Sequence, residues 1–325
     1  MNSPITGNPM RLMREKRIIP FRKEDFDVDF HYWLCEDTKE KFEDEQQAEL
    51  NISQVYNQYR AKHNVPTTDE IRRIRAMYGI SASKMADVLG FGTNQYRQYE
   101  TGEIPSISNG RLIMQAADPE DFLKMVKSAT FELGKDVAYE LKLTIEEKIK
   151  MKAIDISIDY SESMSELTGY KRLSVQKLWN MVIFFADRIQ PYKVKLNKLL
   201  FYSDFYHFKV YGNSISGSTY RAIQYGPVPA DYQILMAQGV LSGVLESKTV
   251  EMYDFNAECL LGKIEFQKNL FTDEELAVLQ RVTERFAESN NQQIIKISHL
   301  EKAWTECEKS HSLIDYRYAF DLMAV

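Results

Sequence analysis

The sequence is poor in cysteine, histidine and tryptophan, and it carries no excess of positive charge. Its 325 residues include three cysteines, five histidines and three tryptophans. Cys35, Cys259 and Cys307 lie far apart, which excludes a disulfide scaffold and is typical of a reducing, cytoplasmic setting. The formal net charge of −6 excludes coating of nucleic acid by bulk charge, but it does not exclude a local groove-reading surface.

Long apolar segments and catalytic motifs are also missing. No apolar run reaches the roughly 18 residues of a membrane span, and MNSPITGNPMRLMREKR lacks the apolar core of a signal peptide. There is no phosphate-binding loop, H-E-x-x-H or G-x-S-x-G motif. We therefore expect a cytoplasmic protein that has no membrane partner, no catalytic residues, no cofactor and no enzymatic activity. A hydrolase assembled from residues distant in sequence remains an alternative.

The remaining composition is that of an ordinary folded protein, with 44% hydrophobic and 27% charged residues. The periodicity predicts a mainly α (α+β) fold: a helix-turn-helix bundle, a helical domain carrying a small antiparallel sheet, and a small N-terminal β-hairpin element. We divide the chain into an N-terminal element and helix (1–65), a helix-turn-helix domain (66–130), a helical connector (131–172) and a C-terminal domain (173–325).

The N-terminal element has a weak pattern. Residues 1–15 contain prolines and a glycine without an apolar period, and we expect them to be disordered. Partial alternation in 17–37 predicts a short hairpin, and a helix is expected over 38–63 because Pro66 breaks it.

Capping residues and glycines predict a series of short helices between 67 and 128. Ser81 is placed to cap a helix over 82–89 and Gly90 to stop it. The next helix is expected to run from about 93 to 102.

This last helix carries side chains suited to reading a DNA groove. Asn and Gln can pair with adenine and Arg with guanine, and a helix N-terminus can meet a phosphate. Tyr96 and Tyr99 should face inward, and the predicted DNA-binding residues are Thr93, Asn94, Gln95, Arg97 and Gln98. The alternative is a small helical bundle with a polar outer face.

The segment GFGTNQYRQYETGEIPS resembles the helix-turn-helix of MqsA-type antitoxins, the YgiT-like, Xre-related group. In that family an Asn early in the recognition helix and an Arg four residues later contact bases. The Asn corresponds to Asn94, whereas the second position holds Gln98 and Arg97 lies one step earlier. The resemblance implies operator DNA as a partner, and paired half-sites imply a homodimer.

That family also has an N-terminal zinc domain with two C-x-x-C pairs. Here YWLCEDTKEKFEDE resembles the second pair, with Cys35 in place and Thr38 at its partner position, and no first pair of cysteines occurs in residues 1–30. One thiolate cannot hold structural zinc, so we predict a degenerate zinc finger and no metal. Cys35 is then a small buried apolar residue.

The C-terminal domain is predicted to hold several helices and two extended regions. Helices are expected over 174–189, 194–211, 229–238, 272–289 and 297–309, and a hairpin is expected over 242–268, between the third and fourth of these helices. Thr272 and Glu275 form a capping-box pattern at the start of the helix expected over 272–289.

Residues 174–320 resemble the SocA-like Panacea domain in three stretches, VKLNKLLFYSDFYHFKVYGNSISG, YRAIQYGPVPADY and ISHLEKAWTECEK. The resemblance implies a toxin-binding domain and, in one family member, a proteolytic adaptor. Its aromatic helix should be partly core and partly contact surface. The predicted toxin-binding residues are Lys198, Tyr202, Tyr206, Tyr225, His299 and Trp304, although a satisfied core histidine is the simpler interpretation of His299.

Together these patterns predict an antitoxin of a type II toxin–antitoxin system. Its C-terminal domain would neutralise a cognate protein toxin, and its helix-turn-helix would repress the shared operon. The alternatives are a transcription regulator whose C-terminal domain senses another partner, and a proteolytic adaptor.

Overall fold

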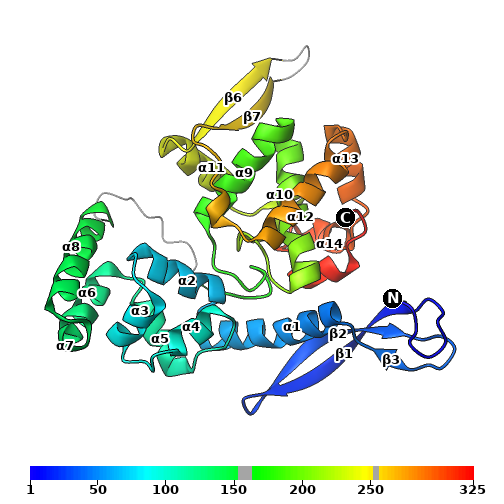
Figure 1. The fold of residues 1–325 in the computed structure, drawn as a ribbon. Coiled ribbons are helices and arrows are strands. Elements are labelled where there is room, and N and C mark those ends of the chain that lie inside the picture. The colour runs from blue at the N-terminus through cyan, green and yellow to red at the C-terminus, as the bar shows by residue number, and fades with distance from the viewer. Residues whose placement is uncertain (153–162, 252–255) are drawn as a thin grey trace. The chain divides into compact units, whose positions relative to one another are not determined.

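A computed structural model describes residues 1–152, 163–251 and 256–325 (Figure 1). The chain forms two compact units. The helical unit comprises Gln58–Tyr160, and the composite unit joins Met1–Asn57 to Ser161–Val325. Helices dominate and the sheets are small and antiparallel, which confirms the predicted mainly α (α+β) class. Within the described ranges, every helix is too short or too polar to span a bilayer.

The helical unit consists mainly of short helices, several of which begin at a capping side chain. In chain order they are α2 (Thr68–Met77), α3 (Ala82–Leu89), α4 (Gln95–Glu100), α5 (Ile107–Gln115), α6 (Pro119–Ser128), α7 (Thr130–Leu133) and α8 (Lys135–Lys152). The Ser81 hydroxyl accepts from the Lys84 N–H at the start of α3, and Gly90 ends α3 in the left-handed region at φ 68°. The predicted helix over 82–89 is thus confirmed.

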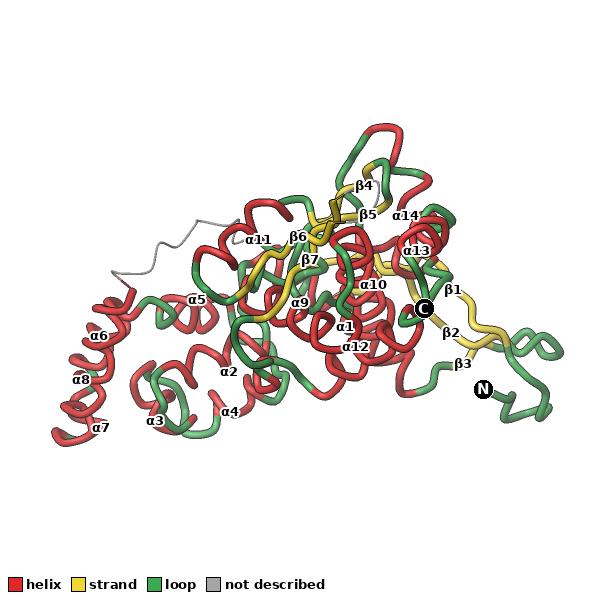
Figure 2. The backbone as a smooth tube through the Cα atoms, turned by 90° about the horizontal axis from the view of Figure 1, so that it is seen from above, coloured by secondary structure: helices red, strands yellow, loops and turns green. Residues whose placement is uncertain are grey.

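One apolar core joins these helices. Ile71, Met85, Tyr96 and Phe122 are buried in it, and so are residues of α8 such as Ile145. Helices α6 and α8 lie side by side, as Figure 2 shows. The amphipathic α8 therefore packs with the short helices.

The composite unit opens with a long hairpin that the sequence pattern only partly indicated. Strand β1 (Arg11–Phe21) pairs with β2 (Glu24–Leu34) along its whole length, and β2 pairs with β3 (Lys41–Phe42). The turn residues Arg22 and Lys23 both have positive φ, the conformation of a tight two-residue hairpin turn. The expected disorder of residues 1–15 is wrong, because β1 is held by backbone pairing while much of its side-chain surface stays exposed, which leaves no apolar period.

Helix α1 (Glu45–His63) begins later than predicted. Residues 38–44 hold a turn, β3 and the helix start, where Asp44 accepts hydrogen bonds from the Gln47 N–H at 2.9 Å and the Trp33 indole at 2.8 Å. The helix expected from 38 is therefore wrong over its first seven residues, because Asp44 fixes the start through a tertiary contact.

The hairpin packs against the end of the chain. His31 lies edge-on to Phe320 with 4.6 Å between ring centroids, and Arg14 pairs with Asp321 at 2.9 Å. Near the C-terminal end of helix α10 (Lys193–Tyr211), Asn57 donates to the Gly212 carbonyl at 2.9 Å. The N-terminal and C-terminal segments thus share one compact unit.

The rest of the composite unit surrounds one buried helix, α10 (Lys193–Tyr211). This helix contacts α9, β5, β7, α12, α13 and η3 (Figure 1). The other elements are α9 (Val175–Ile189), β4 (Tyr220–Ile223), β5 (Gly226–Pro229), α11 (Tyr232–Leu241), β6 (Leu245–Glu251), β7 (Asn256–Gly262), η1 (Lys268–Leu270), α12 (Asp273–Phe286), α13 (Asn291–Ser298), α14 (Lys302–Thr305), η2 (Glu308–Ser310) and η3 (Tyr316–Asp321).

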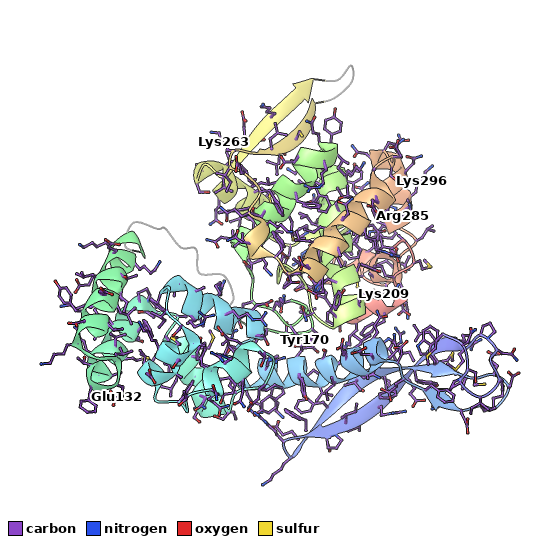
Figure 3. The ribbon with its side chains drawn as sticks, viewed as in Figure 1. Glu132, Tyr170, Lys209, Lys263, Arg285 and Lys296 are labelled. Atoms are coloured by element: carbon purple, nitrogen blue, oxygen red, sulfur yellow. The ribbon has the colours of Figure 1, made fainter. Side chains whose placement is uncertain are left out.

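The last predicted helix is broken in two. His299 ends α13 and Glu301 precedes α14, so the single helix expected over 297–309 is wrong. The reason is the buried Glu301 carboxylate, which accepts from the backbone N–H groups of Met323 and Ala324 at 3.0 Å. Lys209 and Arg285 donate to carbonyls of the same terminal segment, and Figure 3 labels both side chains.

Candidate functional sites

Helix α4 is anchored by its two tyrosines. Tyr96 is fully buried and its hydroxyl donates to the Ile71 carbonyl at 2.8 Å, while the Tyr99 hydroxyl accepts from the Asn109 amide at 2.8 Å. Burial raises the pKa of Tyr96 well above its ordinary value, so the hydroxyl stays a donor at neutral pH. These bonds fix which face of α4 points outward.

The opposite face holds the predicted DNA-binding residues. Thr93, Asn94, Arg97 and Gln98 are exposed, whereas Gln95 is half-buried and donates to Glu103 at 3.3 Å. Asn94 stands at the N-cap position, but its side chain makes no capping hydrogen bond. Its amide is consequently not committed to the helix end and can face a ligand.

Arginines of α2 hold α4 in place. Arg75 pairs with the buried Glu100 at 2.6 Å, and the Arg72 Nε donates to the Glu100 carbonyl at 2.9 Å. Arg73, between them, is exposed. Of this arginine group, Arg72 and Arg75 position α4, which leaves Arg73 as the residue suited to meeting a phosphate.

A second candidate site surrounds the turn between β4 and β5, which contains Tyr225. We call the turn residues 223–226 together with Lys198, His299, Leu300 and Trp304 the turn cluster. The Lys198 ammonium is buried and donates to the Pro227 carbonyl at 3.0 Å. Burial lowers the pKa of Lys198 to about 7.

Gly226 makes this arrangement possible. Its φ is +94°, and a Cβ there would lie 2.7 Å from Lys198 Cε and 2.5 Å from Ser298 Oγ. The Y-G-P-V turn therefore needs glycine both for its backbone conformation and for the close approach of Lys198.

The outer part of the turn cluster is aromatic. His299 and Trp304 stack with 3.8 Å between centroids and 9° between planes, and the Trp304 indole donates to the Ile223 carbonyl at 2.8 Å. Burial and the Lys198 charge lower the pKa of His299, which favours the neutral ring. Tyr225 is 55% exposed at the turn, and Leu300, next to His299, is 69% exposed.

The two other predicted toxin-binding residues have different neighbours. Tyr202 is fully buried, stacks on Phe286 at 4.7 Å and makes a hydrogen bond with Glu301 at 3.4 Å. Tyr206 is half-buried beneath the Arg281 guanidinium, 4.8 Å from its ring centroid. The structure thus brings Lys198, Tyr225, His299 and Trp304 together and directs Tyr202 and Tyr206 toward α12.

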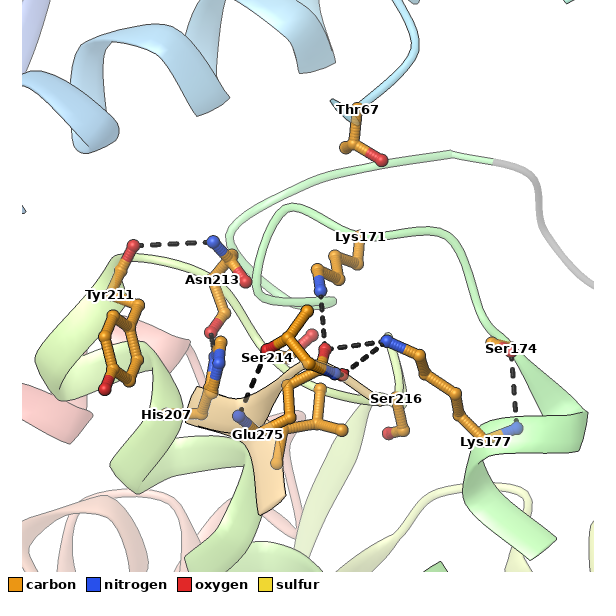
Figure 4. A network of polar contacts seen from close by, with 12 residues as sticks. Thr67, Lys171, Ser174, Lys177, His207, Tyr211, Asn213, Ser214, Ser216 and Glu275 are labelled. Carbon is orange, nitrogen blue, oxygen red and sulfur yellow. Dashed lines mark hydrogen bonds and ion pairs between the residues drawn. The ribbon is translucent and has the colours of Figure 1, made fainter. Parts of the chain in front are cut away.

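Glu275 and Asp204 are two further carboxylates whose burial the sequence did not indicate. Glu275, the capping-box residue of α12, accepts from Lys171 at 3.0 Å and Lys177 at 2.7 Å (Figure 4). Burial acts to raise the pKa of Glu275, but the two lysines outweigh it and hold the pKa below its ordinary value.

Asp204 is the second. Its carboxylate is fully buried and accepts from the Ile215 and Ser216 N–H groups, each at 2.8 Å, and from the Tyr220 hydroxyl at 2.8 Å. A lone Asp in the apolar stretch KLLFYSDFY, followed by the serine-rich loop NSISGS, was the available signal. Both carboxylates fix the loops that surround α10.

Comparison with known families identifies part of the composite unit. Residues 196–305 match the family model described as antitoxin SocA-like, Panacea domain. This range includes most of α10 and the whole turn cluster. No curated protein and no solved structure matches the chain significantly.

Proposed function

We propose that the chain is the antitoxin of a type II toxin–antitoxin system and acts in the cytoplasm. The match of residues 196–305 to an antitoxin family carries this proposal. The exposed polar face of α4 in the same chain supports a second role in binding operator DNA and repressing the shared operon. The proposal assigns binding and no catalytic step.

The turn cluster is the proposed toxin-binding surface. Aromatic side chains at a rigid, partly exposed turn are typical of residues that dominate the free energy of protein association. Tyr225 and Leu300 supply exposed apolar area, while Lys198 and the Trp304 indole fix the turn backbone from below. A preorganised turn loses little conformational entropy when it binds.

The proposed DNA contact uses Asn94, Arg97 and Gln98 as base-reading residues. The chain as a whole is acidic, so attraction to phosphates is weak and a single reading head would bind poorly. A homodimer that places two α4 helices on paired half-sites would make up for this.

Co-expression with the product of the adjacent gene tests the first role. The native chain should relieve the growth arrest that this product causes. The double variant Tyr225→Ala/Leu300→Asp should lose the rescue, because it removes the exposed apolar area without touching the core. Its matched control is Tyr139→Ala/Leu143→Asp, which changes an exposed Tyr and Leu on α8 and should rescue normally.

Substitutions should separate toxin neutralisation from operator binding. Asn94→Ala should keep the rescue while operator binding weakens, and the turn-cluster double variant should keep operator binding. A neighbouring product that is harmless, or rescue that survives the turn-cluster change, would contradict the proposed toxin binding and favour the regulator alternative. Rapid loss of the toxin from cells, without a stable complex, would favour a proteolytic adaptor.

A further inference from the structure

The N-terminal segment contains the same six-residue turn twice. In residues 3–8 the Ser3 N–H donates to the Asn8 carbonyl, and the Gly7 N–H donates to the Ser3 carbonyl. Residues 35–40 repeat both bonds: the Cys35 N–H donates to the Glu40 carbonyl, and the Lys39 N–H to the Cys35 carbonyl. The fifth residue of each turn has positive φ, 76° at Gly7 and 61° at Lys39.

The repetition extends to the side chains and the flanking backbone. The Asn8 N–H donates to the Thr6 hydroxyl at 3.4 Å, and the Glu40 N–H donates to the Thr38 hydroxyl at 3.4 Å. Each turn is also closed by an antiparallel pair at equivalent positions, Asn2 with Pro9 and Leu34 with Lys41. The first and fourth residues of the turns are therefore equivalent: Ser3 with Cys35, and Thr6 with Thr38.

These four side chains meet at the Cys35 thiol. Cys35 Sγ lies 3.7 Å from Thr6 Oγ1, and the hydroxyls of Ser3 and Thr38 also make hydrogen bonds with the thiol. Ser3 and Cys35 are buried, and Asn8 donates to Asp37 at 2.9 Å between the two turns.

Two facing turns with side chains at their first and fourth positions are the arrangement that supplies four ligands to a structural zinc ion. The chemistry of the donors present does not fit that ion. Structural zinc takes thiolate, imidazole or carboxylate ligands, and here one thiol stands with three neutral hydroxyls. Across the described residues, no group of three or more His, Cys, Asp or Glu could hold a metal.

We infer that Ser3, Thr6, Cys35 and Thr38 form a four-position metal cradle in which hydroxyls occupy three ligand positions and hydrogen bonds to the thiol replace the metal. The absence of a first cysteine pair is thus a change of side chain at positions 3 and 6, while the turn that would carry that pair is present. The N-terminal part of the composite unit then needs no metal to fold. This inference is independent of the proposed antitoxin role.

Restoring the thiols tests the inference on the full-length, reduced chain. The variant Ser3→Cys/Thr6→Cys/Thr38→Cys should bind one Co²⁺ or Zn²⁺ per chain, with the visible spectrum of tetrahedral thiolate-bound Co²⁺. Its matched control, Asn2→Cys/Ile5→Cys/Asp37→Cys, adds the same number of thiols one residue earlier at exposed positions. Co²⁺ should bind the first variant at least about 100-fold more tightly than the control.

The native chain supplies the second half of the test. It should take up no stoichiometric zinc, and a chelator should leave its melting temperature unchanged. Tight zinc in the native chain, or a restored variant that binds no better than the control, would overturn the inference. If the restored variant is unfolded without metal, circular dichroism that regains the native signal on adding zinc supports the inference, and failure to regain it overturns the inference.

Discussion

The face of α4 and the turn cluster are both candidate sites, the first predicted from side-chain type and the second from the family resemblance, yet they use their residues differently. On α4, polar residues lie outward and the two tyrosines hold the helix from within. In the turn cluster, the charged residue lies inward: Lys198 is 1% exposed and the apolar Tyr225 is 55% exposed. The usual relation between polarity and exposure holds in the first site and is reversed in the second.

The difference follows from how much of each supporting helix, α4 or α10, is buried. Helix α4 has six residues, so its tyrosine face can be buried while the rest stays in solvent. Helix α10 is surrounded on all sides, and even Lys195, Asn197 and Asp204 are buried there. On α10, Lys195, Lys198 and Asp204 make hydrogen bonds with backbone groups, whereas the exposed polar side chains at α4 are available to a ligand.

Truncation of a predicted toxin-binding residue inside α10 should have the largest effect. Tyr202→Ala removes a fully buried ring and should lower the free energy of unfolding by about 3–5 kcal/mol, measured by urea denaturation. The exposed Tyr139 offers a matched control, and Tyr139→Ala should cost no more than about 0.5 kcal/mol. Equal losses of unfolding free energy at the two positions would show that Tyr202 contributes no more to stability than an exposed tyrosine does.

The turn of the second site should be almost as sensitive. Gly226→Ala should cost about 2–4 kcal/mol of unfolding free energy, because it combines left-handed strain with a clash against Lys198 and Ser298. Gly243 has a similar φ of +74° and open space at its Cβ position, so Gly243→Ala isolates the strain. A loss no larger than that of Gly243→Ala would show that Lys198 does not pack tightly on the turn.

The exposed site should respond in binding and not in stability. Asn94→Ala should weaken operator binding by about 1–3 kcal/mol and relax discrimination at one base pair, measured by titration at fixed salt. Gln115→Ala, on the exposed surface of α5, is the control and should bind as the native chain does. If the Asn94→Ala variant binds the operator with unchanged affinity, α4 is not the helix that contacts the bases.

The buried lysine predicts a pH dependence. Its folded pKa of about 7 lies below the value of about 10.4 expected in the unfolded chain, so between these values the unfolded chain binds the additional proton. The free energy of unfolding should therefore rise with pH across this window, by at most about 1.4 kcal/mol per pH unit from Lys198. Lys198→Met should reduce that slope, and the part that remains is expected from Lys195 and Lys209, whose pKa values burial also lowers. A slope identical to that of the native chain would mean that Lys198 is solvated.

Local signals predicted much of the helical unit. Ser81, Gly90 and the spacing of apolar residues act within a few residues, and the helix over 82–89 lies where they predict. The elements of the composite unit were harder to predict from local signals. Asp44 delays α1 and Glu301 divides the last helix, and each does so through partners that are distant in the chain or in another element. The prediction of disorder for residues 1–15 failed because β1 is stabilised by pairing with β2 and not by an apolar face.

The sequence by itself determined the fold class, the ends of α3 and the set of polar residues at α4, because caps, glycines and periodicity depend on neighbouring residues. Only the tertiary structure decided that Lys198 supports the turn from inside, that Glu275 and Asp204 are buried, and that Ser3, Thr6 and Thr38 surround Cys35. Each of these depends on contacts between segments far apart in the chain, and the free energy of burying a polar group is set by partners that local sequence does not specify.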